Sequence, residues 1–288
     1  MFDIIKKSYL ITKNNSPIIL FWILYLLVMP ICSSVLLRVQ GTLLLFFTLF
    51  LLILLNVAFF SGWFKMIKQA IKNSEKNYLI EDEKYKDILD LRISFFEAIP
   101  EYMLPLLSIF AIYYFAFLAW VMTTIKLAEK FIGKIDFLLE NLKTIQVSTA
   151  SALEYIQNLP TEQLKILYEW QTFLILSIAI FGIFTLFLPP ALYFEKNNKK
   201  NPLRAFLNSF KVFFKKPVEI IIFNVVIGIL FFIMMLLQAL CSANLVLYFF
   251  YFLISTWLTT YFVVLLFNYY DKRFAYNSNN RADSFREN

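Results

Sequence analysis

The chain contains six continuous apolar runs, each of about 20 residues or more, and these runs limit what it can fold into. A helix needs about 20 apolar residues to cross the roughly 30 Å hydrocarbon core of a bilayer. The runs do not alternate with polar residues, as the strands of a membrane barrel would. Hydrophobic residues make up 60% of the 288 residues, against about 45–50% in soluble domains. The sequence therefore predicts an all-α integral membrane protein with six transmembrane helices.

The predicted spans cover residues 17–37, 43–63, 103–125, 170–190, 218–240 and 245–267. Together they form a single transmembrane domain over residues 1–270. A polar cytoplasmic tail over residues 271–288 follows it. The helix of the second span is expected to continue through Ile71, because apolar residues keep their helical spacing to that point.

The residues between the third and fourth spans form the one sizeable outer segment, residues 126–166. Its apolar residues repeat at helical spacing, so we expect a helical extension of the third span, with a break near residues 148–151 or 158–160. Thr161 is expected to cap the helix that returns to the fourth span. The pair Pro189-Pro190 is expected to close or kink that span, since proline disrupts a helix interior.

The distribution of Lys and Arg predicts the orientation. Of 27 such residues, 21 lie in the N-terminal segment, residues 64–102, residues 195–216 and the tail, and 6 lie in the other connections. Basic loops stay in the cytoplasm, so both termini are predicted to be cytoplasmic. The Lys-, Ile-, Asn- and Phe-rich usage suggests a bacterial cytoplasmic membrane. The net charge of +7 is explained by orientation and anionic lipid, and no nucleic-acid partner is expected.

The stretch from Asn201 to Leu230 joins a polar-faced helix to the fifth span. Asn201 and Pro202 form a helix start, because Asn caps free N–H groups and Pro fits the first helical position. Phe and Leu then recur on one face at steps of three and four residues. Polar and basic residues occupy the other face: Arg204, Asn208, Lys211 and Lys215. The helix is expected to end before Pro217.

A helix with an aromatic face and a basic face suits the boundary between acyl chains and anionic headgroups. We therefore predict headgroup contacts for four cations: Arg204, Lys211, Lys215 and Lys216. The alternative is that this helix packs against the spans of the protein itself. The absence of acidic residues on its polar face favours the bilayer interface.

Two further amphipathic stretches, residues 1–16 and residues 87–102, also precede pairs of spans. Ser8, Ser94 and Ser209 fall at similar places in the three stretches. The polar face of the second stretch is acidic, so packing against protein or a basic partner suits it better than anionic headgroups. The order of elements predicts three repeats of one unit, an amphipathic interfacial helix followed by a transmembrane hairpin.

This order of elements, with Pro189-Pro190 and the sequence AFLNSFKVFFKKP at residues 205–217, resembles a group of bacterial six-span integral membrane proteins. That group is related to the membrane domain of glycerophosphoryl diester phosphodiesterases. The resemblance covers most of the chain and implies an architecture. It implies no catalytic residues, because the sequence contains no phosphodiesterase domain.

The composition excludes several kinds of chemistry. The chain has no histidine and two cysteines, Cys32 and Cys241, so neither a Cys/His metal site nor His-based catalysis is available. Its five glycines are scattered and form no phosphate loop. We therefore expect no catalytic residues, no cofactor and no metal. The two cysteines fit buried free thiols better than a disulfide.

Four polar residues in or beside the spans are candidates for intramembrane contacts or a cavity: Asn56, Glu101, Glu219 and Asn224. Such residues are costly in a membrane and need partners. Asn56 and Asn224 fit interhelical hydrogen bonds better than a transport site. Glu219 is expected to pair with Lys215 or Lys216. Glu101 either faces a cytoplasmic cavity or lies on a solvated or headgroup-level face.

Three hypotheses for the function follow. The first is a non-enzymatic organiser or assembly partner of other membrane components, since three interfacial helices accompany no catalytic set. The second is a transporter or lipid-handling protein with a cavity between the helical repeats. The third, an intramembrane enzyme, lacks the clustered acids or Ser/Lys pairs that it would need. The expected partners are the bilayer, anionic headgroups and other membrane proteins.

Overall fold

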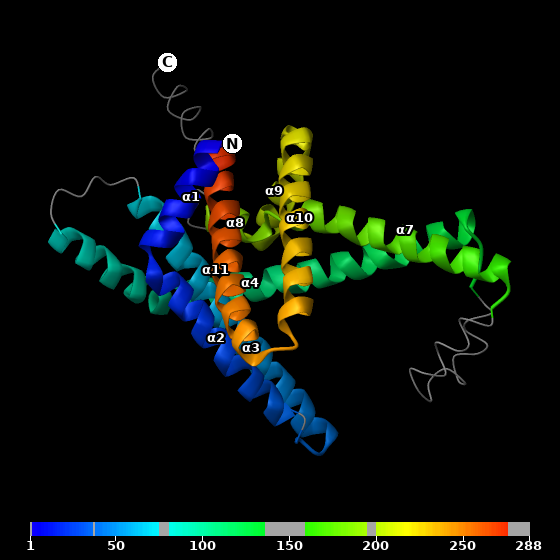
Figure 1. The fold of residues 1–288 in the computed structure, drawn as a ribbon, viewed down its shortest axis with the longest axis horizontal. Helices are drawn as coiled ribbons and strands as arrows, with labels where there is room; N and C mark the ends of the chain where they lie inside the picture. Colours follow the sequence, from blue (N-terminus) through cyan, green and yellow to red (C-terminus); the bar gives the residue numbers. More distant parts are fainter. Residues whose placement is uncertain (1, 37, 75–80, 136–158, 195–199, 276–288) are drawn as a thin grey trace. The chain divides into compact units, whose positions relative to one another are not determined.

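The computed structural model describes residues 2–36, 38–74, 81–135, 159–194 and 200–275 (Figure 1). Over these residues the chain is helical and contains no strand. Six of its helices are long and apolar enough to cross a membrane. The prediction of an all-α, multi-pass membrane protein is confirmed at this level.

The helices of the described residues are α1 (Phe2–Asn14), α2 (Ser16–Leu36), α3 (Thr42–Asn73), α4 (Glu81–Phe131), α7 (Thr161–Thr185), α8 (Leu188–Tyr193), α9 (Pro202–Lys215), α10 (Pro217–Cys241) and α11 (Leu245–Tyr270). A π-helical turn, η1 (Asp271–Ala275), continues α11. The candidate spans lie in α2, α3, α4, α7 with α8, α10, and α11 with η1.

Local signals placed several boundaries correctly. The Asn201 side chain accepts hydrogen bonds from the backbone N–H groups of Leu203 and Arg204, at 3.0 and 3.2 Å, and so caps α9 as predicted. Helix α10 begins at Pro217. Thr161, predicted to cap its helix, is instead the first residue of α7, and the Leu164 N–H donates to the Pro160 carbonyl. Helix α3 continues to Asn73, two residues past the predicted end of the second helix.

Two boundaries differ from the prediction. Helix α7 ends at Thr185, Leu186 and Phe187 form a turn, and Pro189 and Pro190 open α8. The prolines therefore do not close the helix, and the break in the candidate span Thr161–Tyr193 comes just before them. Proline fits the first turn of a helix, where its missing N–H has no intrahelical acceptor. The predicted tail also begins later, because η1 continues the helix through Ala275. The extension and break predicted within residues 136–158 lie outside the described residues.

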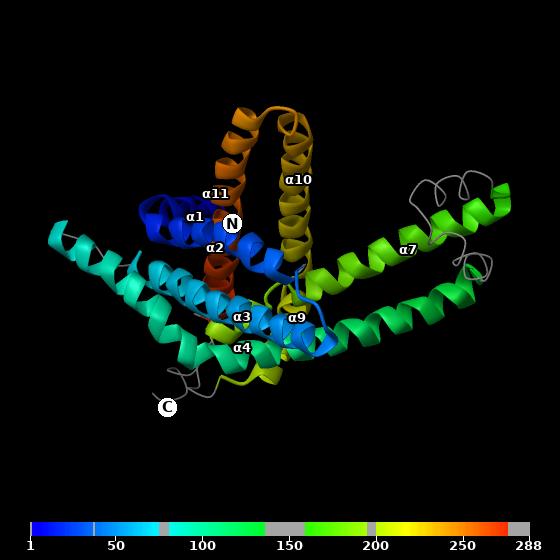
Figure 2. The ribbon, with the colours of Figure 1, turned by 90° about the horizontal axis from the view of Figure 1, so that it is seen from below.

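The second amphipathic stretch and the third span form one helix, α4, which contains Pro100 and Pro105. Proline removes a hydrogen bond inside a helix and kinks it. Figure 2 shows α4 bending along its course. Gly62 lies where α3 approaches α4, and a Cβ atom there would lie 2.5 Å from a ring carbon of Phe95.

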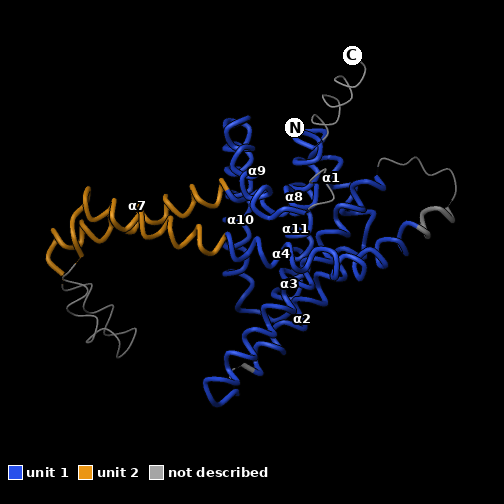
Figure 3. The backbone as a smooth tube through the Cα atoms, turned by 180° about the vertical axis from the view of Figure 1, so that it is seen from behind, with its two compact units in different colours: residues 1–112, 185–288 blue, residues 113–184 orange. Residues whose placement is uncertain are grey.

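The chain divides into two compact units, Met1–Ile112 with Thr185–Asn288, and Tyr113–Phe184 (Figure 3). In the first unit, α1 packs against α11, α2 against α3, α8 against both α3 and α9, and α10 against α11. Its largest buried side chains include Trp63 and Phe267. The Trp63 indole donates a 3.0 Å hydrogen bond to the Ile18 carbonyl and so joins α3 to α2.

The second unit contains the end of α4 and most of α7. The Trp120 indole donates to the Ser177 hydroxyl at 2.7 Å, and Thr124 hydrogen-bonds the same hydroxyl at 2.6 Å. The Trp170 indole donates to the Gly133 carbonyl at 2.8 Å. Figure 3 shows the two helices of this unit side by side. Hydroxyl and indole groups therefore join a hairpin that is otherwise apolar, as is usual between transmembrane helices.

Candidate functional site

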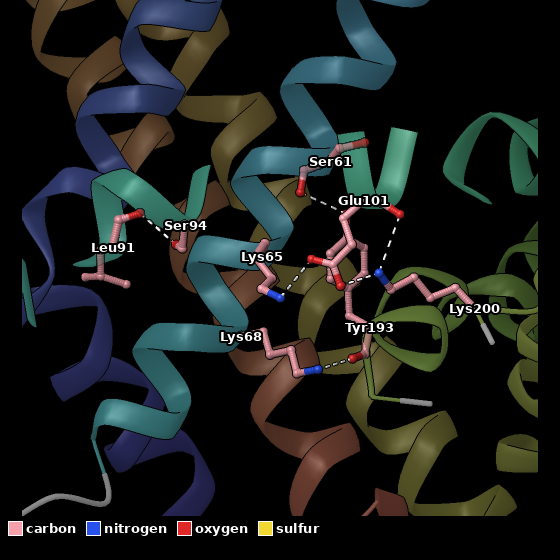
Figure 4. A network of polar contacts seen from close by, with 8 residues as sticks. All are labelled: Ser61, Lys65, Lys68, Leu91, Ser94, Glu101, Tyr193 and Lys200. Atoms are coloured by element: carbon pink, nitrogen blue, oxygen red, sulfur yellow. Dashed lines mark hydrogen bonds and ion pairs between the residues drawn. The ribbon is translucent and has the colours of Figure 1, made fainter. Parts of the chain in front are cut away.

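A network of polar contacts in the first unit surrounds Glu101 (Figure 4). Lys65 of α3 places its ammonium 3.3 Å from Oε2 of Glu101. Lys200, just before α9, forms a close ion pair with the other carboxylate oxygen. The three side chains are partly shielded from solvent, with exposed fractions of 23%, 39% and 18% for Lys65, Glu101 and Lys200. One carboxylate thus joins α4 to two other segments of the chain.

Two stacked tyrosines, Tyr102 and Tyr193, lie beside this network. The Tyr102 and Tyr193 rings lie 4.2 Å apart between centroids and are nearly parallel, at 6°. The Lys200 ammonium lies 4.0 Å from the centroid of Tyr102, and that of Lys65 lies 5.2 Å from it. Both distances are within the range of a cation–π interaction. The ring face therefore adds to the attraction that Glu101 exerts on the two cations.

A second lysine of α3, Lys68, binds the end of α8. The Lys68 ammonium donates a close hydrogen bond to the backbone carbonyl of Tyr193, the last residue of that helix. A cation there also favours the negative end of a helix. The Tyr193 hydroxyl donates to the Ser61 carbonyl at 2.9 Å, and its side chain is buried. In Figure 4, Lys65 and Lys68 extend from α3 towards Glu101 and Tyr193 respectively.

The Glu101 side chain is 39% exposed and lines none of the described pockets, so it lies on an exposed face and not in a described cavity. Its carboxylate is held by two cations that also contact Tyr102. Such an arrangement can hold helices together, because each carboxylate oxygen pairs with a cation from another segment.

The predicted intramembrane amides have partners of different kinds. The Asn56 amide accepts a close hydrogen bond from the Tyr25 hydroxyl of α2 and donates to the Leu52 carbonyl at 2.7 Å. It therefore makes the interhelical contact that was predicted. The Asn224 amide donates to the Ile220 carbonyl of its own helix at 2.8 Å. Its described hydrogen bond is intrahelical.

Glu219 pairs with Lys216 as predicted, at 3.4 Å. Two further partners come from the other end of the chain: the Tyr269 hydroxyl donates to Glu219 at 2.8 Å, and Arg273 lies 3.7 Å away. The carboxylate joins the start of α10 to the end of α11 and to η1. Lys216, one of the four cations for which headgroup contacts were predicted, thus pairs with an acid of the protein itself.

The remaining cations of α9 line a pocket of about 240 Å³. Its wall is formed by α8, α9, α11, η1 and Phe194. The lining residues are Ala191, Phe194, Arg204, Asn208, Lys211, Val212, Lys215, Tyr270, Phe274 and Ala275. Three of them are cations and none is an acid. We call this the basic pocket.

Two other pockets have different linings. One, of about 310 Å³, lies between the start of α1 and the end of α11 and mixes Asp3 with Lys7, Lys272 and Arg273. The other, of about 160 Å³, is an apolar groove between α2 and α3. Its lining residues are Phe21, Leu24, Tyr25, Val28, Met29, Leu55 and Phe59. Asn56, Asn224 and Glu101 line none of these three pockets.

The three amphipathic segments share one packing feature. Ser8 of α1, Ser94 of α4 and Ser209 of α9 are all buried, with at most 7% of their surface exposed. Each segment nevertheless leaves large apolar side chains exposed on another face. These are Phe2, Tyr9 and Leu10 in α1, Leu89, Ile93 and Phe96 in α4, and Leu203, Leu207 and Phe214 in α9.

Sequence reasoning missed several partners, namely Lys65, Lys68, Tyr193, Lys200 and Arg273. Lys65 and Lys200 lie 36 and 99 residues from Glu101 in sequence, and no local pattern links them. Cys32 and Cys241 are free thiols. Among the described residues, no group of three or more His, Cys, Asp or Glu side chains could hold a metal ion.

Comparison of the chain with protein-family models, curated proteins and solved structures gave no match. The resemblance to the phosphodiesterase-associated membrane proteins therefore stays a prediction. The candidate sites are described by their own geometry alone: the Glu101 network, the Glu219 cluster and the basic pocket.

Proposed function

We propose that this protein is a non-enzymatic organiser of other membrane components in a bacterial cytoplasmic membrane, with both termini in the cytoplasm. The observation that carries the proposal is the amphipathic segments at the start of α4 and in α1 and α9. Each is anchored by a buried serine and leaves large apolar side chains exposed. Exposed apolar patches of this kind typically mark protein or membrane contacts.

The shared packing of the three serines supports an internal threefold repeat. In each case an interfacial helix rests on the protein through a small buried side chain and precedes a pair of apolar helices. Such a repeat would give the molecule three separate surfaces along one side of the bilayer. Several separate surfaces suit a protein that holds neighbours in place.

The segment of α4 at residues 87–102 is the best candidate for contact with another protein. Its exposed Leu89, Ile93 and Phe96 recur at steps of four and three, and so form one stripe. Asp90 and Glu97 are exposed on the same segment. The acids lie along one side of the stripe and the exposed Arg92 along the other. Such a stripe suits a partner that presents a basic group on the acidic side, because charge complementarity guides association.

Lipid handling is the second candidate, and the apolar groove between α2 and α3 favours it. The groove is lined by aromatic and aliphatic side chains with little polar surface, which suits an acyl chain. In that function the amphipathic helices would place the protein at the interface while a lipid occupied the groove.

The first experiment is native mass spectrometry of the protein extracted in patches of its own membrane. The organiser proposal expects a stoichiometric partner protein. Leu89→Ser, Ile93→Ser and Phe96→Ser together should remove it. A second variant, Phe2→Ser with Leu10→Ser on α1, tests whether this partner is held by the α4 stripe alone, and should retain it.

Two results would contradict the organiser function. One is the retention of a single lipid species with no partner protein, which would favour lipid handling. The other is saturable transport of a substrate by the purified protein in liposomes, which would make the protein a transporter.

A further inference from the structure

We infer that α10 binds α10 of a second copy of this chain in the membrane, through one face that carries Asn224, Gly228 and Gln238. This goes beyond the organiser function and does not depend on it, because the partner is the same chain and not another membrane component. Three features of α10 support it: the spacing of its polar and small residues, the hydrogen-bonding capacity of Asn224, and the contrast with the rest of its exposed surface.

Helix α10 contains two carboxamides and one glycine, and all three share one face. Gln238 lies two heptads after Asn224, and Gly228 lies one turn after Asn224. Apolar residues complete a row with alternating steps of three and four residues. This row, which we call the α10 seam, consists of Ile221, Asn224, Gly228, Phe231, Met235 and Gln238. Such steps give the 3.5-residue period with which two helices pack along each other in left-handed pairs.

The side of α10 that packs against α11 is a different one (Figure 2). The buried residues on that side are Ile220, Phe223 and Met234. In the seam, Ile221 and Met235 expose 47% and 61% of their surface. Phe231 lies at the border, because its ring is 5.4 Å from that of Phe262. A Cβ atom at Gly228 would meet no described heavy atom within 4 Å. Within the first unit, the seam is therefore open to a second helix.

Asn224 brings an incompletely used amide into a candidate span. It lies about 10 Å along α10 from Pro217, at 1.5 Å for each residue. Its amide donates to the Ile220 carbonyl at 2.8 Å, and among the described residues its oxygen and its second N–H group have no partner. Polar groups without partners are costly in a bilayer. A carboxamide offers two donors and one acceptor oxygen, so the best partner supplies both an acceptor and a donor.

A second copy of the chain supplies such a partner at the right depth. Both copies insert in the same orientation, because the same distribution of Lys and Arg directs each of them. A symmetric pair then has its two-fold axis along the membrane normal, and the two α10 helices run parallel. Asn224 would face Asn224, and Gln238 would face Gln238, so each amide can donate to the other. Gly228 allows the two backbones to approach closely, as small residues do between transmembrane helices.

The exposed surface of α10 away from both the seam and α11 has a different composition. We call it the aliphatic face, and it consists of Ile222, Val226, Ile229, Ile233, Leu236 and Leu240. These side chains have no hydrogen-bonding group and suit acyl chains without any protein partner. The carboxamides and the glycine of α10 are therefore concentrated on the seam and are not distributed over its exposed surface.

Cysteine cross-linking of the full-length chain in membranes is the first test. The background carries Cys32→Ser and Cys241→Ser, because both native thiols are free. Single cysteines in the seam are compared with the next residue of the aliphatic face at nearly the same depth. The pairs are Ile221→Cys with Ile222→Cys, Gly228→Cys with Ile229→Cys, and Met235→Cys with Leu236→Cys. Oxidation should give a disulfide-linked dimer from the seam variants only, because a disulfide needs Cβ atoms about 3.5–4.5 Å apart.

The strength of association is measured by Förster transfer between donor-labelled and acceptor-labelled copies in liposomes, as lipid is added to dilute the protein. Asn224→Leu with Gln238→Leu should weaken the dimer at least about fivefold, since an interhelical hydrogen bond contributes roughly a five- to thirtyfold factor in model peptides. Gly228→Phe keeps both carboxamides and places a ring between the helices, so it should abolish transfer. Ile229→Phe, on the aliphatic face, is its matched control and should retain transfer.

Thermal unfolding, followed by tryptophan fluorescence, checks that each variant is folded. Equal cross-linking from the seam and the aliphatic face, or no transfer in the wild-type chain, would overturn the dimer. Transfer that survives both Gly228→Phe and the loss of the two carboxamides would overturn the seam as its interface. Cross-linking of the seam only to a different protein would overturn the choice of a second copy as the partner. Dimers confined to the seam cysteines, and lost in Gly228→Phe alone of the two phenylalanine variants, support the inference.

Discussion

The Glu101 network and the basic pocket are both rich in cations, yet they differ in what their cations join. In the network, Lys65 and Lys200 share one carboxylate and one tyrosine ring. In the pocket, Arg204, Lys211 and Lys215 line a volume that has no acid among its described lining residues. The first arrangement stabilises the fold, because it joins three segments of the chain. The three cations of the second come from a single helix, so they join no separate segments to one another.

This comparison predicts that side chains of the network affect stability more than those of the pocket do. Glu101 joins residues from three segments of the first unit, so its loss would weaken the contacts between these segments. The pocket cations come from a single helix that is already held by Ala205, Ser209 and Val212, which are buried. Removing one of them changes the charge of the pocket and leaves the packing of α9 in place.

The largest effect on the free energy of unfolding is expected from truncation of Tyr193, one of the two stacked tyrosines. Tyr193→Ala should lower the free energy of unfolding by about 3–5 kcal/mol, because it removes a buried ring, its stacking on Tyr102 and its hydrogen bond to Ser61. Phe274→Ala in the wall of the pocket should cost about 1 kcal/mol or less, since that ring is only half-buried. Denaturant unfolding of the purified protein in micelles measures both.

If Tyr193→Ala and Phe274→Ala lowered the free energy of unfolding equally, the network and the pocket would not differ in their contribution to stability. Tyr193→Phe serves as the control for the hydroxyl alone. It keeps the ring and the stacking, so its cost should be about 1 kcal/mol, the usual value of one hydrogen bond.

A charge reversal at each place should give the next largest effect. Glu101→Lys would place a third cation between Lys65 and Lys200, and should cost about 2–3 kcal/mol from two lost ion pairs and the new repulsion. Lys211→Glu introduces an acid among two cations and should change the free energy of unfolding by less than about 0.5 kcal/mol. Thermal unfolding at low ionic strength compares the two.

Salt provides the control for the charge reversals. The Debye length shortens from about 30 Å at 0.01 M salt to about 3 Å at 1 M salt, so the repulsion in Glu101→Lys should shrink as salt is added. If Lys211→Glu proved the more destabilising change, the roles assigned to the two regions would have to be exchanged.

The sequence was sufficient for the spans and for the helix starts because both depend on neighbouring residues. Apolar runs are continuous, and Asn201 caps a helix that begins at the next residue. The break at Leu186 and Phe187 escaped prediction because proline is compatible with both ends of a break: it can stop one helix or occupy the first turn of the next. Pro189 does the second.

The candidate sites were only partly predictable. Periodicity placed Arg204, Lys211 and Lys215 on one face of α9, and the structure adds the wall that turns this face into a pocket. For Glu101, the sequence identified a polar residue beside a span and no partner. Its cations lie in α3 and before α9, so their meeting depends on tertiary packing, which a single sequence does not encode in any local pattern.

The smallest expected effect concerns the coupling within the Glu101 network. A double-mutant cycle with Glu101→Gln and Lys65→Met should give an interaction free energy of about 0.5–1 kcal/mol, as is usual for a partly exposed ion pair. A second cycle that pairs Glu101→Gln with Lys211→Met should give about zero, because Lys211 lines the pocket and not the network. Unfolding of the four chains of each cycle, in the same micelle and at the same salt, measures both values. Coupling of similar size in the two cycles would mean that Glu101 interacts with both groups of cations through long-range electrostatics. Coupling confined to Lys65 would mean that Glu101 interacts with its immediate neighbours and not with the cations of the pocket.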